Sequence, residues 1–205
     1  SRVIFRNVRK GGSILVSKKI AQALAGSSVI RAMFNEGKEM AARYGAENVY
    51  DFSLGNPATP APESVNRTIK EIVNEMDPLE LHGYMSNSGY EDVRRAMAEN
   101  LNRRFQTSFD AHNIIMTVGA AGGLNIIFKT LLDPEDEVIV FAPYFGEYKS
   151  YAANFDAKIV EVEPDFASFQ PDLEKFAGKI TAKTKIVLVN TPNNPTGVVY
   201  TEETL

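Results

Sequence analysis

Residues 185–197 read KIVLVNTPNNPTG, in which a continuous apolar run leads directly into a polar segment with two prolines. Uninterrupted apolar residues are typical of a strand that is buried on both faces of a parallel sheet. The segment after the strand is extended, stiffened by Pro192 and Pro195, and it presents the adjacent amides of Asn193 and Asn194. Because ligands of open α/β sheets bind beyond the carboxyl ends of the strands, these amides predict part of a ligand site.

Upstream of this stretch, strand-like and helix-like patterns alternate. We expect strands at 113–118, 137–141, 158–162 and 185–189, and helices at 122–132, 145–154 and 171–176. Strands that alternate with helices imply crossover connections and a mostly parallel sheet. The sequence therefore predicts an α/β fold, a three-layer sandwich with helices on both faces of the sheet.

The residues before this alternation are expected to form a helical N-terminal segment. Helical spacing predicts helices between 18 and 44, with a break at 26–28, and further helices at 63–75 and 90–105; residues 49–54 alternate as in a strand. The prolines at 57–62 exclude a helix there, since proline fixes φ and lacks an N–H, so we expect a boundary near residue 62. Residues 1–17 contain no acidic side chain and are predicted to be a basic arm or a cloning remnant, with a targeting presequence as the alternative.

Composition restricts the classes of function. The chain has 205 residues, enough for one sizeable core, and its net charge of −4 provides no general basic surface for nucleic acid or an anionic membrane. The absence of cysteine excludes disulfides and a cysteine nucleophile and fits the reducing cytoplasm, where we expect the protein. With two histidines we expect no metal centre, and no apolar run reaches the roughly 20 residues that cross a bilayer.

Residues 117–124, TVGAAGGL, form a glycine-rich junction at the start of an expected helix. Small residues let the backbone approach a ligand, and the free N–H groups of a helix start favour a phosphate. The spacing matches neither a Walker A loop nor a dinucleotide fingerprint. The junction is equally consistent with a phosphate site and with a tight turn against a neighbouring helix.

Aromatic residues mark two further loops. Tyr144 and Phe145 lie just past an expected strand, where an aromatic face could stack on a planar heterocycle. Tyr84 lies in the segment HGYMSNSGY at 82–90, and its hydroxyl could bind an anion. Burial is the more common fate of such side chains, so neither loop assigns a function by itself.

Taken in order, five elements of the chain resemble the class I/II aminotransferases, which are pyridoxal-phosphate enzymes of fold type I. The elements are Gly55-Asn56-Pro57, Tyr84 with Gly89, Gly119-Ala120-Ala121, Pro143-Tyr144-Phe145 and residues 190–197, and the most specific part is Asn194-Pro195-Thr196-Gly197. The resemblance spans residues 18–205. It implies that 18–62 belong to the small domain and that 63–205 form the first, incomplete part of the pyridoxal-phosphate-binding large domain.

The resemblance also implies how pyridoxal 5'-phosphate would be held. The backbone N–H groups of Ala120 and Ala121, with Gly119 in the same turn, would bind its phosphate. Phe145 would stack on its pyridine ring, and Asn194 would hydrogen-bond its phenolic oxygen.

The same resemblance implies the substrates and the assembly. Asn194 would lie near the substrate carboxylate, and Gly55 would border the substrate through its main chain. Tyr84 would reach the cofactor phosphate of the partner subunit, which implies a homodimer with shared active sites. The reaction would move an amino group between an amino acid and a 2-oxo acid, and aspartate is the commonest donor in the family.

The catalytic lysine of the family is not found in these residues. The family's lysine forms the Schiff base with the cofactor and acts as general base and acid, and it follows the Asn-Pro-Thr-Gly element in a Ser-x-x-Lys setting that no lysine here occupies. The family polypeptide is about twice as long as this chain. We therefore expect a fragment that lacks the lysine, the acidic partner of the pyridine nitrogen and the substrate-binding arginine, and that does not transaminate alone.

Three alternatives stay open at this point. A pyridoxal-phosphate β-lyase would use the same cofactor contacts but release ammonia. A non-catalytic cofactor-binding or regulatory module would bind the cofactor without turnover. A phosphate-binding α/β domain of unrelated chemistry would not bind pyridoxal phosphate in a saturable way.

Overall fold

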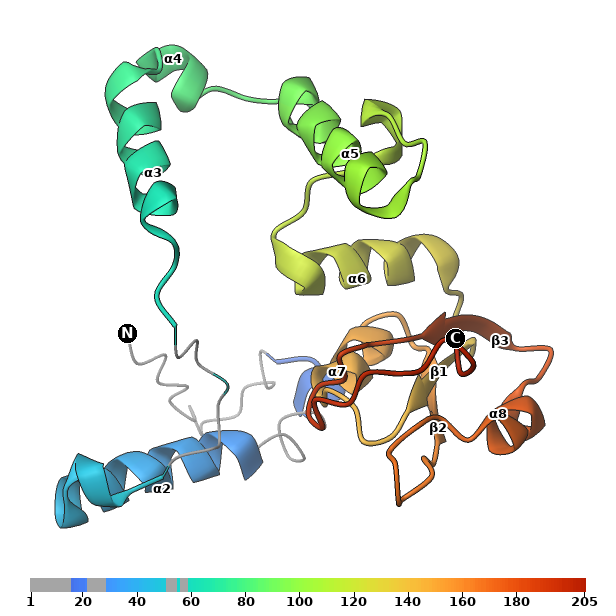
Figure 1. The fold of residues 1–205 in the computed structure, drawn as a ribbon. Helices are drawn as coiled ribbons and strands as arrows, with labels where there is room; N and C mark the ends of the chain where they lie inside the picture. Colours follow the sequence, from blue (N-terminus) through green and yellow to red (C-terminus); the bar gives the residue numbers. More distant parts are fainter. Residues whose placement is uncertain (1–15, 22–28, 51–54, 56–58) are drawn as a thin grey trace, which may run out of the picture. The chain divides into compact units, whose positions relative to one another are not determined.

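The computed structural model of the chain describes residues 16–21, 29–50, 55 and 59–205 (Figure 1). By their internal contacts the residues divide into two compact units, Ser1–Gly83 and Tyr84–Leu205.

The first unit is helical in its described residues. It contains residues 18–21 and the helices α2 (Val29–Tyr44), η1 (Ala46–Asn48), α3 (Glu63–Glu75) and α4 (Pro78–Leu81). The sequence analysis missed α4, which is one turn long and is set by its cap: Asp77 Oδ1 accepts from Leu79 N over 2.8 Å, and Pro78 occupies the first helical position. Of the strand expected at 49–54, Val49 and Tyr50 are not in a strand, and the rest lies outside the described residues.

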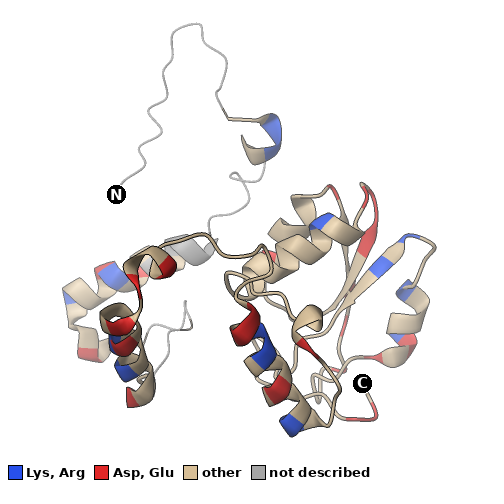
Figure 2. Cartoon of the chain, turned by 90° about the horizontal axis from the view of Figure 1, so that it is seen from above, with Lys and Arg blue, Asp and Glu red and all other residues tan. Residues whose placement is uncertain are grey.

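The second unit begins with three helices, and a polar contact joins the first two. They are α5 (Glu91–Phe105), η2 (Ala111–Asn113) and α6 (Gly119–Leu131). Arg94 on α5 donates to the carbonyl oxygen of Ala111 over 2.6 Å, which fixes η2 against α5. Figure 2 shows acidic and basic residues interspersed along the helices, as expected for solvated faces.

A parallel sheet forms the centre of the second unit. Its described strands are β1 (Glu137–Phe141), β2 (Lys158–Val162) and β3 (Thr184–Leu188), in the order β2-β1-β3. Strand β1 pairs with both neighbours, and all of its residues except Glu137 are buried. An apolar strand between two others is buried on both faces, which explains its continuous hydrophobic sequence.

Helices cover both faces of this sheet. On one face Val138 and Val140 pack with Phe128 of α6 and with Tyr148 of α7 (Glu147–Ala153). On the other face Ile139, Phe141 and Val162 pack together, with Phe176 of α8 (Leu173–Lys179) against them. Figure 1 shows α7 and α8 on opposite sides of the strands. The predicted three-layer α/β architecture is confirmed.

The prediction of a strand at 113–118 is wrong. Residues 111–113 form η2, and 114–118 form no strand. A strand requires a ladder of backbone hydrogen bonds, and here Met116 N donates to Ser88 O while no described strand lies alongside. Ile115 and Val118 are exposed. The apolar run indicated a buried segment, but pairing depends on a partner that local sequence does not reveal.

Candidate functional site

The loop that follows β3, residues 190–200, is here called the asparagine loop. Asn193 is only 6% exposed and its amide is bonded at both ends: Oδ1 accepts from the backbone N–H and from the hydroxyl of Thr196, at 3.2 and 2.9 Å, and Nδ2 donates to the Tyr200 hydroxyl at 3.2 Å. The backbone N–H of Asn193 donates to Val198 O, and that of Gly197 donates to Asn193 O. Gly197 has φ of 74°, a conformation that glycine adopts without strain. These bonds make the loop self-supporting.

Asn194 has the opposite environment. Its backbone N–H donates to Asn190 Oδ1 over 2.9 Å, whereas its side chain is exposed and bonds to no described residue. A primary amide that is held at its backbone and free at its side chain can donate to, and accept from, a ligand.

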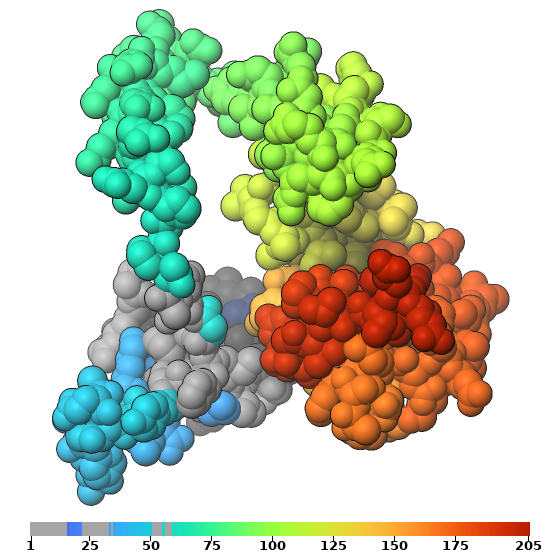
Figure 3. Space-filling model, in the orientation of Figure 1, coloured from blue at the N-terminus to red at the C-terminus, as the bar shows by residue number. Residues whose placement is uncertain are grey.

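Two anchors attach the asparagine loop to the sheet domain. The buried ring of Tyr200 packs edge-on to Phe141 at the end of β1, with 6.3 Å between centroids, and burial raises the pKa of the Tyr200 hydroxyl. Gln170 donates to Val199 O over 3.0 Å and accepts from Thr201 N over 3.2 Å. In Figure 3 the red C-terminal residues lie against the orange residues that precede them, in agreement with these contacts.

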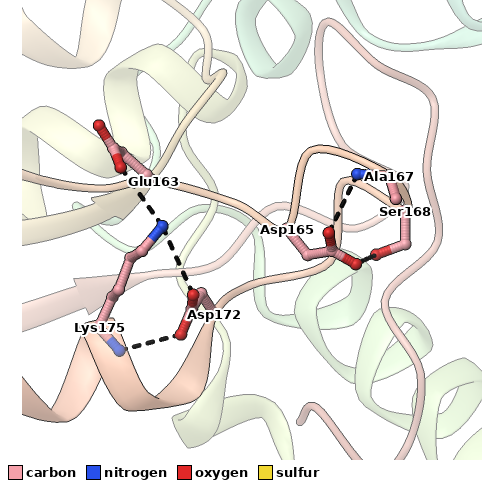
Figure 4. Close-up of polar contacts among 6 residues, drawn as sticks. All are labelled: Glu163, Asp165, Ala167, Ser168, Asp172 and Lys175. Atoms are coloured by element: carbon pink, nitrogen blue, oxygen red, sulfur yellow. Dashed lines mark hydrogen bonds and ion pairs between the residues drawn. The ribbon is translucent and has the colours of Figure 1, made fainter.

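In the sequence Gln170 lies between two sets of polar contacts, one around Asp165 and one around Asp172, and Figure 4 shows both sets. Asp165 accepts from Ala167 N and from the Ser168 hydroxyl, at 3.0 and 2.7 Å, and these bonds hold the pKa of the Asp165 carboxyl below its usual value. Asp172 caps α8 by accepting from Lys175 N over 3.0 Å, and the Lys175 ammonium bridges Asp172 and Glu163. The segment around Gln170, which bonds to the asparagine loop, is therefore ordered by its own polar contacts.

The loop after β1 places Phe145 next to a rigid aromatic group. The Phe145 ring is 38% exposed and meets buried Tyr148 edge-on, with centroids 5.6 Å apart. Tyr144 donates its hydroxyl to Glu161 over 2.6 Å, and Lys149 bonds the same carboxylate at 2.9 Å. The bonds from Lys149 and Tyr144 lower the pKa of Glu161. Burial and the hydrogen bond to Glu161 raise the pKa of Tyr144. The Phe145 ring is thus held by Tyr148 and remains partly accessible.

The start of α6, residues 117–121, is here called the α6 turn. Its N-cap residue is Val118, which makes no side-chain cap, so the N–H groups of Ala120 and Ala121 in the first helical turn have no intrahelical acceptor. Gly119 has φ of 68°, and no atom lies within 4 Å of where its Cβ would be. Open, uncapped N–H groups at a thirteen-residue helix fit an anion such as a phosphate.

The structure brings together some of the predicted site residues and not others. Because β1 and β3 are parallel neighbours, the loops that carry Phe145 and Asn194 leave the same edge of the sheet. Tyr84 is fully exposed, with no described partner. Gly55 is exposed and belongs to the first unit.

Sequence reasoning missed the residues that support the site. Asn193 was recognised only as one of two adjacent amides, and nothing in the order Asn193-Asn194 shows which of them is buried. The contacts of Gln170 and Glu161 with residues far along the chain also left no local signal. Proximity to Pro192 and Pro195, which restrict the backbone, is the sole hint that one amide is fixed.

Among the residues that the structure describes, no helix is both long and apolar enough to span a membrane. In the same residues no group of three or more histidine, aspartate or glutamate side chains is placed to hold a metal ion.

The fold and these loops define a three-layer α/β domain with ligand-type loops at the carboxyl edge of a parallel sheet. Residues 47–205 match the family model for aminotransferase class I and II, and the chain belongs to that family. The resemblance inferred from the motifs is therefore confirmed.

Solved structures and curated relatives agree with this assignment. An aminotransferase from Eubacterium rectale is 47% identical with a TM-score of 0.89, over 94% of this chain and 48% of that chain. An aspartate aminotransferase from Thermotoga maritima is 33% identical over 93% of this chain and 49% of its own length. An alanine aminotransferase from Pyrococcus furiosus is 26% identical with a TM-score of 0.78, over 92% of this chain and 47% of that chain. The chain spans about half the length of the relatives it matches.

Proposed function

We propose that this chain supplies the cofactor-binding half of a pyridoxal-phosphate aminotransferase, which moves an amino group between an amino acid and a 2-oxo acid. The observation that carries the proposal is the pairing of Asn194, whose amide is free, with Phe145, whose ring is accessible, on loops that leave one edge of the sheet. Family membership supplies the reaction class, because class I and II aminotransferases generally depend on this cofactor.

Each group in the proposed site acts on a different part of the cofactor. The N–H groups of Ala120 and Ala121, in the turn opened by Gly119, bind the phosphate. Phe145 stacks on the ring and fixes its plane. Asn194 donates a hydrogen bond to the phenolic oxygen and lies beside the substrate carboxylate. When bound, pyridoxal phosphate supplies an electron sink for the α-carbon of the substrate.

Substrate and assembly are finer parts of the proposal. Aspartate is the proposed amino donor because the Thermotoga maritima relative is named an aspartate aminotransferase, and alanine is the second choice because the Pyrococcus furiosus relative is named for it. Tyr84, fully exposed, is assigned to the cofactor phosphate of the partner subunit in a homodimer, and Gly55 to the substrate. The division of the chain near residue 62 and the cytoplasmic location stay predictions.

The experiment is product analysis with the complete polypeptide that carries these residues. Loaded with pyridoxal phosphate and given aspartate without a 2-oxo acid, it should form the corresponding 2-oxo acid and aminated cofactor in equal amounts. Ammonia in place of aminated cofactor would favour the β-lyase. If neither the 2-oxo acid nor the aminated cofactor forms from aspartate or from alanine, the proposal is contradicted. The 205 residues alone should form neither 2-oxo acid nor aminated cofactor, because no lysine here lies in a Ser-x-x-Lys setting.

A further inference from the structure

We infer that Asn193 is a positioning residue, which sets the orientation of Asn194 and couples it to the strand that leads to Phe145. This inference rests on the proposed function, in which Asn194 contacts the cofactor. Asn193 is placed by the structure where it cannot reach a ligand itself, since it is 6% exposed and its amide bonds only to Thr196 and Tyr200.

The bonds of Asn193 define the backbone on both sides of Asn194. Before Asn194, the backbone N–H of Asn193 donates to Val198 O over 2.8 Å. After it, Asn193 Oδ1 accepts both donors of Thr196. Asn194 is thus held between two residues that are joined to each other across the turn, and its own N–H is held by Asn190. A side chain on such a fixed backbone needs little reordering when it binds a ligand.

Asparagine is the residue type that this position requires. Its oxygen accepts from two donors while its nitrogen donates to the Tyr200 hydroxyl, so both ends of the amide are used. Alanine would leave the Thr196 N–H and hydroxyl without this acceptor in a partly buried position. A buried group that loses its partner destabilises the arrangement it belongs to.

Tyr200 extends the coupling to the rest of the site. Its hydroxyl accepts from Asn193, and its ring packs against Phe141, the last residue of β1. Phe145 lies four residues beyond Phe141 on the same chain segment. The contacts of Asn193 with Tyr200 and of Tyr200 with Phe141 therefore form a continuous path from the residue that holds Asn194 to the strand that leads to Phe145.

The test is a double-mutant cycle on the complete polypeptide, with the dissociation constant of pyridoxal phosphate as the readout. Asn193→Ala should weaken binding about five-fold, which is the effect of losing one ordinary hydrogen bond. In an Asn194→Ala background the same change should have almost no effect, because a positioning residue acts only through the group it positions. The pH midpoint of the bound cofactor's absorbance should rise in both single variants, since Asn194→Ala removes the hydrogen bond to the ionised phenolic oxygen and Asn193→Ala weakens it by releasing Asn194.

Controls separate positioning from general stability. Asn102→Ala on α5 removes an amide that, like Asn193, accepts from a threonine hydroxyl and a backbone N–H and donates through its nitrogen, and it should change neither the dissociation constant nor the absorbance midpoint. Should Asn193→Ala not fold, Thr196→Val should reproduce its effects and Thr196→Ser should not, because serine keeps the hydroxyl that bonds Asn193.

Two outcomes overturn the inference and can be told apart. Equal, additive effects of Asn193→Ala in the wild-type and Asn194→Ala backgrounds would show that Asn193 does not act through Asn194. Unchanged cofactor binding in Asn194→Ala itself would overturn the proposed role of Asn194, and the inference with it.

Discussion

The asparagine loop and the α6 turn are two different solutions to holding a ligand. In the asparagine loop, Asn193 is buried and bonded, and the loop is anchored through Tyr200 and Gln170. In the α6 turn, Val118 is 94% exposed and provides no cap. A side-chain donor has rotatable bonds and must be held by its neighbours, whereas backbone N–H donors are already oriented by the helix and need only to stay unsatisfied. The difference predicts different responses to substitution.

The largest effect is expected where the asparagine loop meets the core. Tyr200→Ala removes a buried ring that packs on Phe141 and should lower the free energy of unfolding by about 3 kcal/mol. Tyr200→Phe keeps the ring and loses only the bond with Asn193, so it should cost about 1 kcal/mol. Urea unfolding of the complete polypeptide measures both. Equal costs for the two variants would mean that ring packing does not anchor this loop.

The next effect concerns the backbone of the α6 turn. Gly119→Ala places a side chain at φ of 68°, which costs about 1–2 kcal/mol, with no clash to add because no atom lies near the new Cβ. Gly146 is the matched control, since it has an equally open surrounding but φ of −57°, and Gly146→Ala should be close to neutral. Thermal unfolding distinguishes them. Equal losses in the two variants would indicate that the conformation of Gly119 is not what the turn depends on.

A new cap on α6 should separate stability from binding. In Val118→Asp the carboxylate can accept from the N–H groups of Ala120 and Ala121, which should stabilise the protein by about 1 kcal/mol. The same carboxylate should compete with the cofactor phosphate and weaken pyridoxal phosphate binding. Val118→Ala, which adds no acceptor, is the control and should do neither. In the asparagine loop, by contrast, stability and binding should fall together.

The smallest expected effect is a pH dependence of stability that comes from Asp165, near Gln170. The pKa of Asp165 is lowered by its bonds from Ala167 and Ser168, so its stabilising contribution is present above the unfolded value of about 4 and is lost as the pH falls through the lowered pKa. The advantage of wild type over Asp165→Asn should therefore be full at pH 6 and shrink below about pH 4. Ser168→Ala, which removes one of the two donors, should lie between them. A constant difference across this range of pH would exclude the effect.

Sequence alone predicted the elements whose determinants are local. Helix α3 begins and ends at the expected residues, because Pro62 precedes it and its apolar residues keep helical spacing. Strands β1 and β2 also have the expected bounds, since β1 has four consecutive apolar residues after Glu137 and β2 is rich in β-branched residues between two helical segments. Helix α6 starts three residues earlier than expected, because Gly119 lies within the first turn rather than before it.

Features that depend on distant partners were not predictable. The apolar residues at 114–118 looked like a strand, yet pairing is decided by a neighbour elsewhere. The Asn193-Asn194 pair identified the site, but which amide is buried depends on the bonds of Asn193 with Thr196 and Tyr200 and on the packing of Tyr200 against the distant Phe141.

The central claim is that the asparagine loop and the α6 turn hold different ends of pyridoxal phosphate. The most direct test is to measure the dissociation constants of pyridoxal phosphate and of pyridoxal, which lacks the phosphate, for the complete polypeptide and its Val118→Asp and Asn194→Ala variants. We predict that Val118→Asp reduces the preference for the phosphorylated ligand, whereas Asn194→Ala weakens both ligands by the same factor and keeps the preference. An unchanged preference in Val118→Asp, or a preference lost in Asn194→Ala, would contradict the claim.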